Sequence, residues 1–201
     1  GTTILTAATY QATFEGFMAA GSSRAEAEGF MVKAVECARR AIELEKTRAV
    51  VAASIGSYGA ALADGSEYRG DYRCSFRDLV AFHQPRLRLL AQHADLLACE
   101  TIPCLLEARA LAVCLAEIDA PAWVSFSCRD AHRVHHGETL EACASAVAGV
   151  DQVKAVGINC TDPKHVTSLL RSLRRATDKP LVAYPNSGES WAGTWSGAAL
   201  S

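Results

Sequence analysis

Apolar residues along the chain follow two alternating patterns. Short runs of β-branched and other apolar residues occupy positions 3–9, 50–55, 95–99, 122–127, 155–159 and 180–184. Longer segments between these runs carry apolar residues three and four positions apart, which is the spacing of an amphipathic helix. Short strands that are apolar on both faces and alternate with helices are typical of parallel βαβ units. The pattern therefore predicts an α/β protein with six such units.

The predicted helices carry start signals. Ser23 and Glu26 have the spacing of a capping box, in which a hydroxyl and a carboxylate bind free amide groups of the first turn, and residues 75–78 repeat it. The Asp-Pro pair at 162–163 suits an N-cap followed by proline in the first helical position. Pro85 is expected to kink or split the helix that contains it. The helices are expected at 24–42, 75–90, 105–118, 139–147 and 163–173.

Two architectures fit this order of elements: an open doubly wound sheet and a (β/α)8 TIM barrel. A dinucleotide-binding sheet favours a glycine-rich turn that leads directly into a helix. Gly56, Gly59 and Gly65 lack that spacing, so the barrel is favoured. A barrel of this kind takes about 250 residues. We therefore expect residues 1–201 to form one barrel domain that is incomplete at both ends, with the first and last strands missing.

Composition narrows the functional classes. Half of the residues are hydrophobic and the formal net charge is −2, which argues against nucleic acid as a partner because phosphate binding needs a concentrated basic surface. No apolar run approaches the roughly 18 residues of a membrane span, and the first residues do not resemble a signal peptide. The eight cysteines include no CxxC pair and mostly lie in apolar runs, as buried free thiols do. We expect a soluble cytoplasmic protein, and the sequence leaves its oligomeric state open.

In either architecture, function gathers at the carboxyl ends of the strands. The residues there are hydroxyls, thiols, amides and one carboxylate, with no histidine among them. A Ser-His-Asp arrangement is hard to build from this set, whereas chemistry on a thiolate or a metal thiolate is easier. The candidates are Thr6, Thr9, Tyr10, Ser57, Tyr58, Glu100, Thr101, Ser127, Cys128, Asn159, Cys160, Tyr184, Pro185 and Asn186.

Two of these positions carry the sharpest hypotheses. Cys160 ends a predicted strand just before a helix start, where the local field favours a thiolate, so it could be a zinc ligand or a nucleophile. A packed, inert thiol is the alternative, because cysteine is often simply buried. Glu100 closes an apolar run and could bind an ammonium group or act as an acid or base. It could equally cap the helix that begins near Leu105.

Two polar segments are weaker candidates. The H-x-x-H-H cluster of His132, His135 and His136 could bind a metal, but no carboxylate stands at a recognisable spacing, so solvated turn histidines are favoured. Residues 64–72 hold two tyrosines and three acids. They form either a surface turn or a lid over the barrel mouth that would suit a cationic ligand.

Taken together in order, the strand-end motifs resemble the homocysteine S-methyltransferase family. The resemblance extends over nearly the whole chain, and the loop at 64–72 is most similar to the branch that uses S-methylmethionine rather than betaine. The matching segments are Thr6-Ala-Ala-Thr-Tyr-Gln11, Gly56-Ser-Tyr-Gly-Ala60, Leu62-Ala-Asp-Gly-Ser-Glu-Tyr68, Gly70-Asp-Tyr72, Glu100-Thr-Ile-Pro103, Val124-Ser-Phe-Ser127, Gly157-Ile-Asn-Cys160 and Tyr184-Pro-Asn-Ser-Gly-Glu189.

The resemblance implies a zinc-dependent methyltransferase. In the family, three cysteines of the barrel hold zinc; one corresponds to Cys160, and the other two belong to a Gly-Gly-Cys-Cys motif expected beyond Ser201. Zinc would bind the homocysteine sulfur, which would take a methyl group from S-methylmethionine, or from S-adenosylmethionine, and give methionine. By the same resemblance the substrate pocket is formed by Glu100, which holds the homocysteine amino group, with Thr6 and Tyr10 lining the pocket and Asn159 and Asn186 bracing it.

Two other functions compete with this one. A metal-independent barrel lyase or isomerase would use Glu100 as its base. A non-catalytic relic of the family would bind amino acids or a partner barrel without turning anything over. Metal content would separate the first alternative from the methyltransferase, and the cysteine pair expected beyond Ser201 would separate the second.

Overall fold

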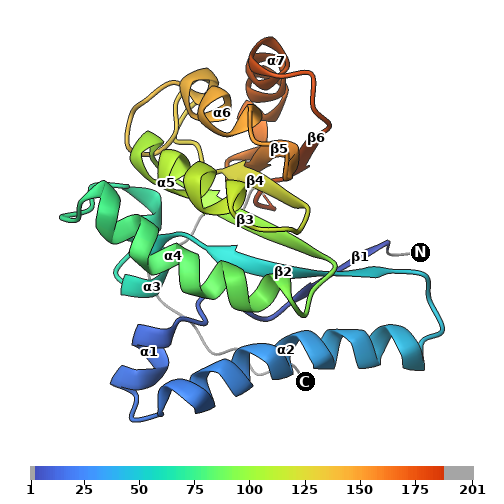
Figure 1. Cartoon of the computed structure of the whole chain (residues 1–201). Coiled ribbons are helices and arrows are strands. Elements are labelled where there is room, and N and C mark those ends of the chain that lie inside the picture. The colour runs from blue at the N-terminus through green and yellow to red at the C-terminus, as the bar shows by residue number, and fades with distance from the viewer. Residues whose placement is uncertain (1–2, 188–201) are drawn as a thin grey trace, which may run out of the picture.

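The computed structural model describes residues 3–187, and its centre is a six-stranded parallel sheet (Figure 1). The strands stand in chain order, and each pairs only with its sequence neighbours. A doubly wound sheet permutes its strand order and carries helices on both faces, whereas a barrel keeps chain order. The observed strand order therefore supports the barrel and excludes the doubly wound sheet. The strands are β1 (Ile4–Ala7), β2 (Val50–Gly56), β3 (Leu96–Ile102), β4 (Ala122–Phe126), β5 (Val153–Asn159) and β6 (Leu181–Tyr184).

The helices pack side by side in an outer layer, α4 against α5, α5 against α6 and α6 against α7 (Figure 1). Both predicted capping boxes are present, at Ser23 with Glu26 and at Ser75 with Asp78. Asp162 caps the short helix η2 through the Lys164 amide. The helices are α1 (Phe14–Ala19), α2 (Arg24–Leu44), α3 (Tyr58–Leu62), η1 (Ser66–Tyr68), α4 (Phe76–Ala91), α5 (Leu105–Ala116), α6 (Leu140–Ala148), η2 (Pro163–His165) and α7 (Val166–Ala176).

The two faces of the sheet differ in character. Side chains on the helix side form one apolar core, as Val51, Ile55, Leu97 and Val124 illustrate. The registers bring the alternate positions of neighbouring strands together on the other face. These positions are small or polar, including Ser54, Glu100, Ser125, Gly157, Asn159 and Tyr184. The apolar core thus stabilises the sheet from the helix side, and the other face, which is concave, carries the polar side chains.

A side-chain contact shows that the sheet is strongly curled. The Tyr184 hydroxyl on β6 donates a hydrogen bond to Glu100 Oε2 on β3 at 2.8 Å. In a flat sheet, strands three positions apart would be separated by about 14 Å. Curling of this kind, with strands in chain order and helices outside, is the geometry of a partial (β/α)8 barrel.

One predicted strand end and the split allowed for at Pro85 were wrong. The strand at 95–99 continues to Ile102, so Glu100 lies within β3 rather than after it. Pro85 does not split its helix, because α4 runs without interruption from Phe76 to Ala91. Proline costs a helix about 3 kcal/mol, whereas Leu87 and Leu90 beyond it are fully buried and contribute about 1.5–3 kcal/mol each.

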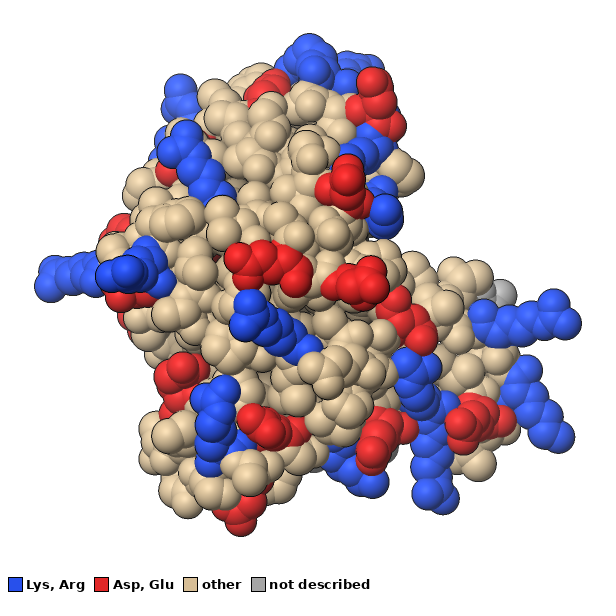
Figure 2. Space-filling model, viewed as in Figure 1, with Lys and Arg blue, Asp and Glu red and all other residues tan. Residues whose placement is uncertain are grey.

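No helix within residues 3–187 combines the length and the apolar character that crossing a lipid bilayer would require. All eight cysteines are free; five are buried and Cys37 is exposed. On the face seen in Figure 2, acidic and basic side chains are interspersed.

Candidate functional site

Glu100 stands in an irregular part of β3, among hydroxyl groups. The register between β3 and β4 shifts between Cys99 and Ile102, as at a β-bulge, which re-aims the side chains it contains. The Glu100 carboxylate accepts hydrogen bonds from the Tyr184 hydroxyl, at 2.8 Å, and from the Ser54 hydroxyl. It does not cap the helix at Leu105, whose N-cap is Cys104, so that alternative was wrong. Two hydroxyls therefore orient a half-buried carboxylate on the concave face.

Tyr184 links this carboxylate to its neighbours. Its hydroxyl lies 2.7 Å from the Ser125 hydroxyl and accepts a hydrogen bond from Trp123 Nε1 at 3.0 Å. Burial, followed by the proximity of Glu100, raises the pKa of Tyr184 above its usual value. The phenol therefore stays protonated at neutral pH and donates to the carboxylate.

Two residues of the site adopt a backbone conformation that favours glycine. Thr101 has φ 61° and Cys160 has φ 46°. The Asn159 side chain joins them: its Oδ1 accepts from the Thr101 amide at 2.8 Å, and its Nδ2 donates to Thr101 Oγ1 at 2.7 Å and to Cys160 Sγ at 3.3 Å. Ser125 Oγ also donates to Asn159 Oδ1, at 2.9 Å. Such conformations persist only where neighbours hold them, and they gather at functional sites.

Cys160 is the candidate reactive group, and its sulfur is surrounded by donors. Besides the Asn159 amide, the Thr101 hydroxyl lies 3.5 Å from Sγ. The Tyr68 hydroxyl faces the same thiol, and burial together with this contact raises the pKa of Tyr68 to about 12. Burial also raises the pKa of Tyr10, whose hydroxyl faces Thr101. Groups that donate toward the sulfur are also common around metal-bound cysteines.

The segment 64–72 reaches the Cys160 thiol and packs closely against neighbouring backbone. A Cβ at Gly59 would lie 2.4 Å from the Glu67 amide nitrogen, so α3 packs directly on η1. Gly70, with φ 71°, packs in the same way against His136, Cys104 and Pro103. Ser127 Oγ donates to the Glu67 carbonyl oxygen at 3.3 Å. Close backbone packing therefore brings Glu67 and Tyr68 to the strand ends.

The remaining predicted residues lie at varying distances from this centre. Thr6 lies on β1 opposite Ala52, exposed on the concave face. The ring of Tyr10 packs on Gly56, where a Cβ would lie 2.8 Å from it. Asn186 is exposed, and its backbone amide donates to the Thr161 carbonyl at 3.0 Å. Gly188 and Glu189, the end of the last matching motif, lie outside the described residues.

The histidine cluster stands beside the lid segment. His135 packs edge-on against Tyr68, with ring centroids 5.4 Å apart, and His136 Nδ1 lies 2.9 Å from Glu138 Oε1. The sequence interpretation overlooked this carboxylate partner. Between residues 3 and 187, no three histidine, cysteine or acidic side chains are grouped closely enough to hold a metal ion. The described residues therefore do not by themselves form a metal site.

Sequence reasoning missed the supporting residues one layer below the strand ends. Ser54 lies two positions before Gly56, the last residue of β2, and Ser125 lies two positions before Ser127, each on the same face of its strand as that later residue. Because side chains alternate between the two faces of a strand, counting back two positions from each strand end would have found them. The contacts of Tyr184 with Glu100 and of Asn159 with Thr101 join non-adjacent strands, and only the curl of the sheet creates them.

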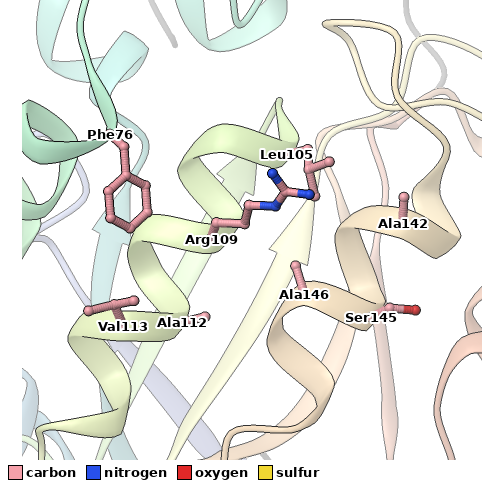
Figure 3. Close-up of a pocket in the computed structure, with 8 residues that line it drawn as sticks. All are labelled: Phe76, Leu105, Arg109, Ala112, Val113, Ala142, Ser145 and Ala146. Atoms are coloured by element: carbon pink, nitrogen blue, oxygen red, sulfur yellow. The ribbon is translucent and has the colours of Figure 1, made fainter.

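A separate hollow lies on the outer helical surface, between α5 and α6 (Figure 3). In Figure 3 the Arg109 side chain extends from α5 toward α6, above alanines from both helices. None of the predicted site residues lines this hollow. Its lining is Phe76, Leu105, Arg109, Ala112, Val113, Ala142, Ser145 and Ala146.

Comparison with known families gives a match along almost the entire chain. The model of a family described as homocysteine S-methyltransferase matches residues 1–199. Homocysteine S-methyltransferase YbgG of Bacillus subtilis (strain 168) is 46% identical over 206 residues, which cover 96% of this chain and 65% of that protein. Homocysteine S-methyltransferase of Escherichia coli (strain K12) is 47% identical over 192 residues, 92% of this chain and 62% of that protein. Selenocysteine methyltransferase of Astragalus bisulcatus is 40% identical over 215 residues, 95% of this chain and 64% of that protein.

Solved structures give the same correspondence. The metallated form of the homocysteine methyltransferase MmuM from Escherichia coli superposes with a TM-score of 0.88 at 46% identity, covering 94% of this chain and 68% of that one. Its oxidised form gives a TM-score of 0.87, covering 92% and 66%. This chain therefore spans about two thirds of the length of the proteins it matches.

Proposed function

This chain belongs to the homocysteine S-methyltransferase family, and from this premise we propose that the protein transfers a methyl group from a sulfonium donor to the sulfur of homocysteine, giving methionine. The observation that carries the proposal is Cys160, a partly exposed thiol with hydrogen-bond donors directed at its sulfur. It lies on the same concave face as the oriented carboxylate of Glu100. A candidate zinc ligand and a candidate binding group for the substrate's ammonium therefore lie on the same face.

The chemistry around Cys160 fits a zinc ligand. The amide of Asn159 and the hydroxyl of Thr101 both donate toward the sulfur, as groups around a metal-bound thiolate commonly do. When bound, zinc supplies a Lewis acid that lowers the pKa of a thiol into the neutral range. We infer that the two other thiolates come from beyond Ser201.

Glu100 is proposed to bind the acceptor's ammonium group. A carboxylate fixed by two hydroxyl donors keeps free lone pairs toward the concave face, and a charge-assisted hydrogen bond to an ammonium group is strong. Thr6 and Tyr10 would line the same pocket. Asn159 would act as a brace, since its amide is fully engaged by Thr101, Ser125 and Cys160.

The donor is proposed to be a sulfonium amino acid, S-methylmethionine first and S-adenosylmethionine second. Glu67 and Tyr68 lie on the segment 64–72, next to Cys160. A carboxylate beside the face of an aromatic ring is a favourable site for a cation. The homocysteine thiolate attacks the methyl carbon and a new S–C bond forms. The bond to the donor sulfur breaks, and its electron pair leaves that sulfur as a neutral thioether. No proton has to be supplied, so the step needs no general acid.

The eight free thiols fit a reducing compartment, so we place the protein in the cytoplasm. We propose small-molecule partners only. A relative is named selenocysteine methyltransferase, so a selenium-containing acceptor is a second candidate and belongs in the assay beside homocysteine.

The test uses the full-length protein, assayed for methyl transfer to homocysteine with each donor, alongside metal analysis. Cys160→Ser should release zinc and abolish transfer, because a free thiol is mostly protonated at pH 7. Circular dichroism should remain that of the wild type, since the apolar core lies on the opposite face of the sheet.

Cys128→Ser is the matched control: this thiol is buried near the strand ends and should leave zinc content unchanged. Full zinc and full activity in Cys160→Ser would overturn the metal assignment. A wild-type protein with zinc but no transfer from any donor would identify a non-catalytic relic, and activity without metal would favour the lyase or isomerase.

A further inference from the structure

Two buried charges outside the site hold the turn that follows β2. Arg86 on α4 is 1% exposed and Glu107 on α5 is 0% exposed. Arg86 Nη2 donates to the Gly56 carbonyl oxygen at 2.6 Å. Glu107 Oε1 accepts from the Tyr58 backbone amide at 2.5 Å. The two side chains therefore fix the backbone immediately before and after Ser57, one by its carbonyl and one by its amide.

A buried histidine and aromatic rings surround this pair. His83 Nε2 lies 2.8 Å from Glu107 Oε1, and burial lowers the pKa of His83, so the ring donates as a neutral group. The Tyr58 ring packs against Phe82 and Tyr72, with centroids 5.1 and 5.2 Å away. Burying opposite charges is costly, and packed apolar residues could join two helices at less expense. The placement of these charges calls for a reason other than stability.

Two parts of the candidate site depend on the turn that Arg86 and Glu107 hold: the residues around Glu100, and the segment that carries Tyr68. Gly56 supports the ring of Tyr10 and is paired in register with Glu100. Gly59 supports the backbone of Glu67, and through it the segment that carries Tyr68 to Cys160. A shift of the turn at Ser57 would displace these groups together.

We propose that Arg86 and Glu107 are positioning residues that hold the β2–α3 turn and thereby seat residues 58–72 as the binding surface for the methyl donor. This inference rests on the proposed function for its substrate. The positioning itself rests on the four hydrogen bonds that Arg86 and Glu107 make with Gly56, Ala12, Tyr58 and His83.

The first test compares two substitutions in α5 and its C-cap, in the full-length protein. Glu107→Gln removes the buried charge at constant size, whereas Glu117→Gln removes an exposed charge that pairs with Arg88 of the same neighbouring helix, α4. We expect Glu107→Gln to raise the KM for the sulfonium donor tenfold or more. Its kcat should change by less than threefold, and Glu117→Gln should alter neither. A purely structural role would instead lower the active fraction, and hence kcat, at constant KM.

The second test does not depend on activity. Trypsin cuts after Arg69 and Arg73, which lie in or next to the seated segment, and native-state cleavage there should be at least tenfold faster in Glu107→Gln than in Glu117→Gln. Arg86→Lys, which keeps the charge but loses the planar fork, should fall between wild type and Glu107→Gln in both tests. Unchanged donor KM and unchanged cleavage in these variants would overturn the proposal.

A third measurement uses only the wild-type protein and holds if the variants fail to fold. Hydrogen exchange in peptides covering residues 58–72 should slow when S-methylmethionine binds. Absence of that protection in an enzyme that transfers methyl groups would overturn the donor seat while leaving the proposed function intact. Absence of methyl transfer by a wild-type protein that trypsin cleaves slowly would overturn the proposed function and its donor, and leave only the positioning role of Arg86 and Glu107.

Discussion

At the residue scale, the site depends on Asn159 more than its predicted bracing role suggested. The amide group of Asn159, on β5, makes two hydrogen bonds with Thr101 on β3 and one with Cys160. Left-handed backbone costs a side chain other than glycine about 1–2 kcal/mol, and the Asn159 bonds offset that cost at both positions. The asparagine thereby sets the direction in which the candidate ligand thiol points.

Glu100 gives the prediction that belongs to this scale. Glu100→Ala should raise the KM for homocysteine by about 10- to 100-fold, because a hydrogen bond to a charged group contributes about 1.5–3 kcal/mol. Zinc content should stay at the wild-type level, since the carboxylate contacts hydroxyls rather than the Cys160 sulfur. Steady-state kinetics and metal analysis on one preparation check both. Loss of zinc with an unchanged KM would reverse the assigned role.

At the scale of elements, close strand packing at Gly157 fixes the last strand of the sheet. A Cβ on Gly157 would lie 2.1 Å from the Val182 carbonyl oxygen, which is backbone and cannot move alone. Val182 is the register partner of Gly157 on β6, the strand that also delivers Tyr184 to Glu100. The glycine of the Gly-Ile-Asn-Cys motif is thus a packing requirement as well as part of a motif.

Two glycine substitutions test this packing. Gly157→Ala should destabilise the protein by about 2 kcal/mol or more, through a forced separation of β5 and β6. Gly29→Ala, within α2 where a Cβ meets nothing within 4 Å, should stabilise it by about 0.5–1 kcal/mol. Urea denaturation of both variants measures the difference. Equal stability of Gly157→Ala and wild type would show that the two strands are not packed so closely.

At the scale of the whole molecule, many buried groups hold protons that an unfolded chain would release. Burial raises the pKa of the thiols of Cys128 and Cys143 to about 12, and burial also raises the pKa of Tyr10 and Tyr72. Above pH 9 the unfolded chain binds fewer protons than the folded one, so the free energy of unfolding falls as pH rises.

Each buried thiol should cost about 1.4 kcal/mol per pH unit above 9. Urea denaturation under reducing conditions should therefore show a loss of several kcal/mol between pH 7.5 and pH 10.5. Returning the sample to pH 7.5 should restore the stability and exclude chemical damage. An unfolding free energy that does not change over this range would mean that these groups are hydrated.

The local patterns of the sequence determined the elements. The order of the strands and of the longer helices and both capping boxes could be read from periodicity and spacing, because these features depend on neighbours within a few residues. The same reasoning ended β3 too early and allowed α4 to split at Pro85. The bulge in β3 and the buried residues on both sides of Pro85 depend on packing against other elements.

The site as a connected arrangement was decided only by tertiary structure. Sequence periodicity left a barrel and a doubly wound sheet both possible; the strand order in chain sequence, held by a continuous core on one face, excluded the latter. The curl then brought Tyr184 to Glu100 and Asn159 to Thr101, residues 84 and 58 positions apart in the chain. Contacts of that separation depend on how the whole sheet bends, and no local pattern of residues records that bend.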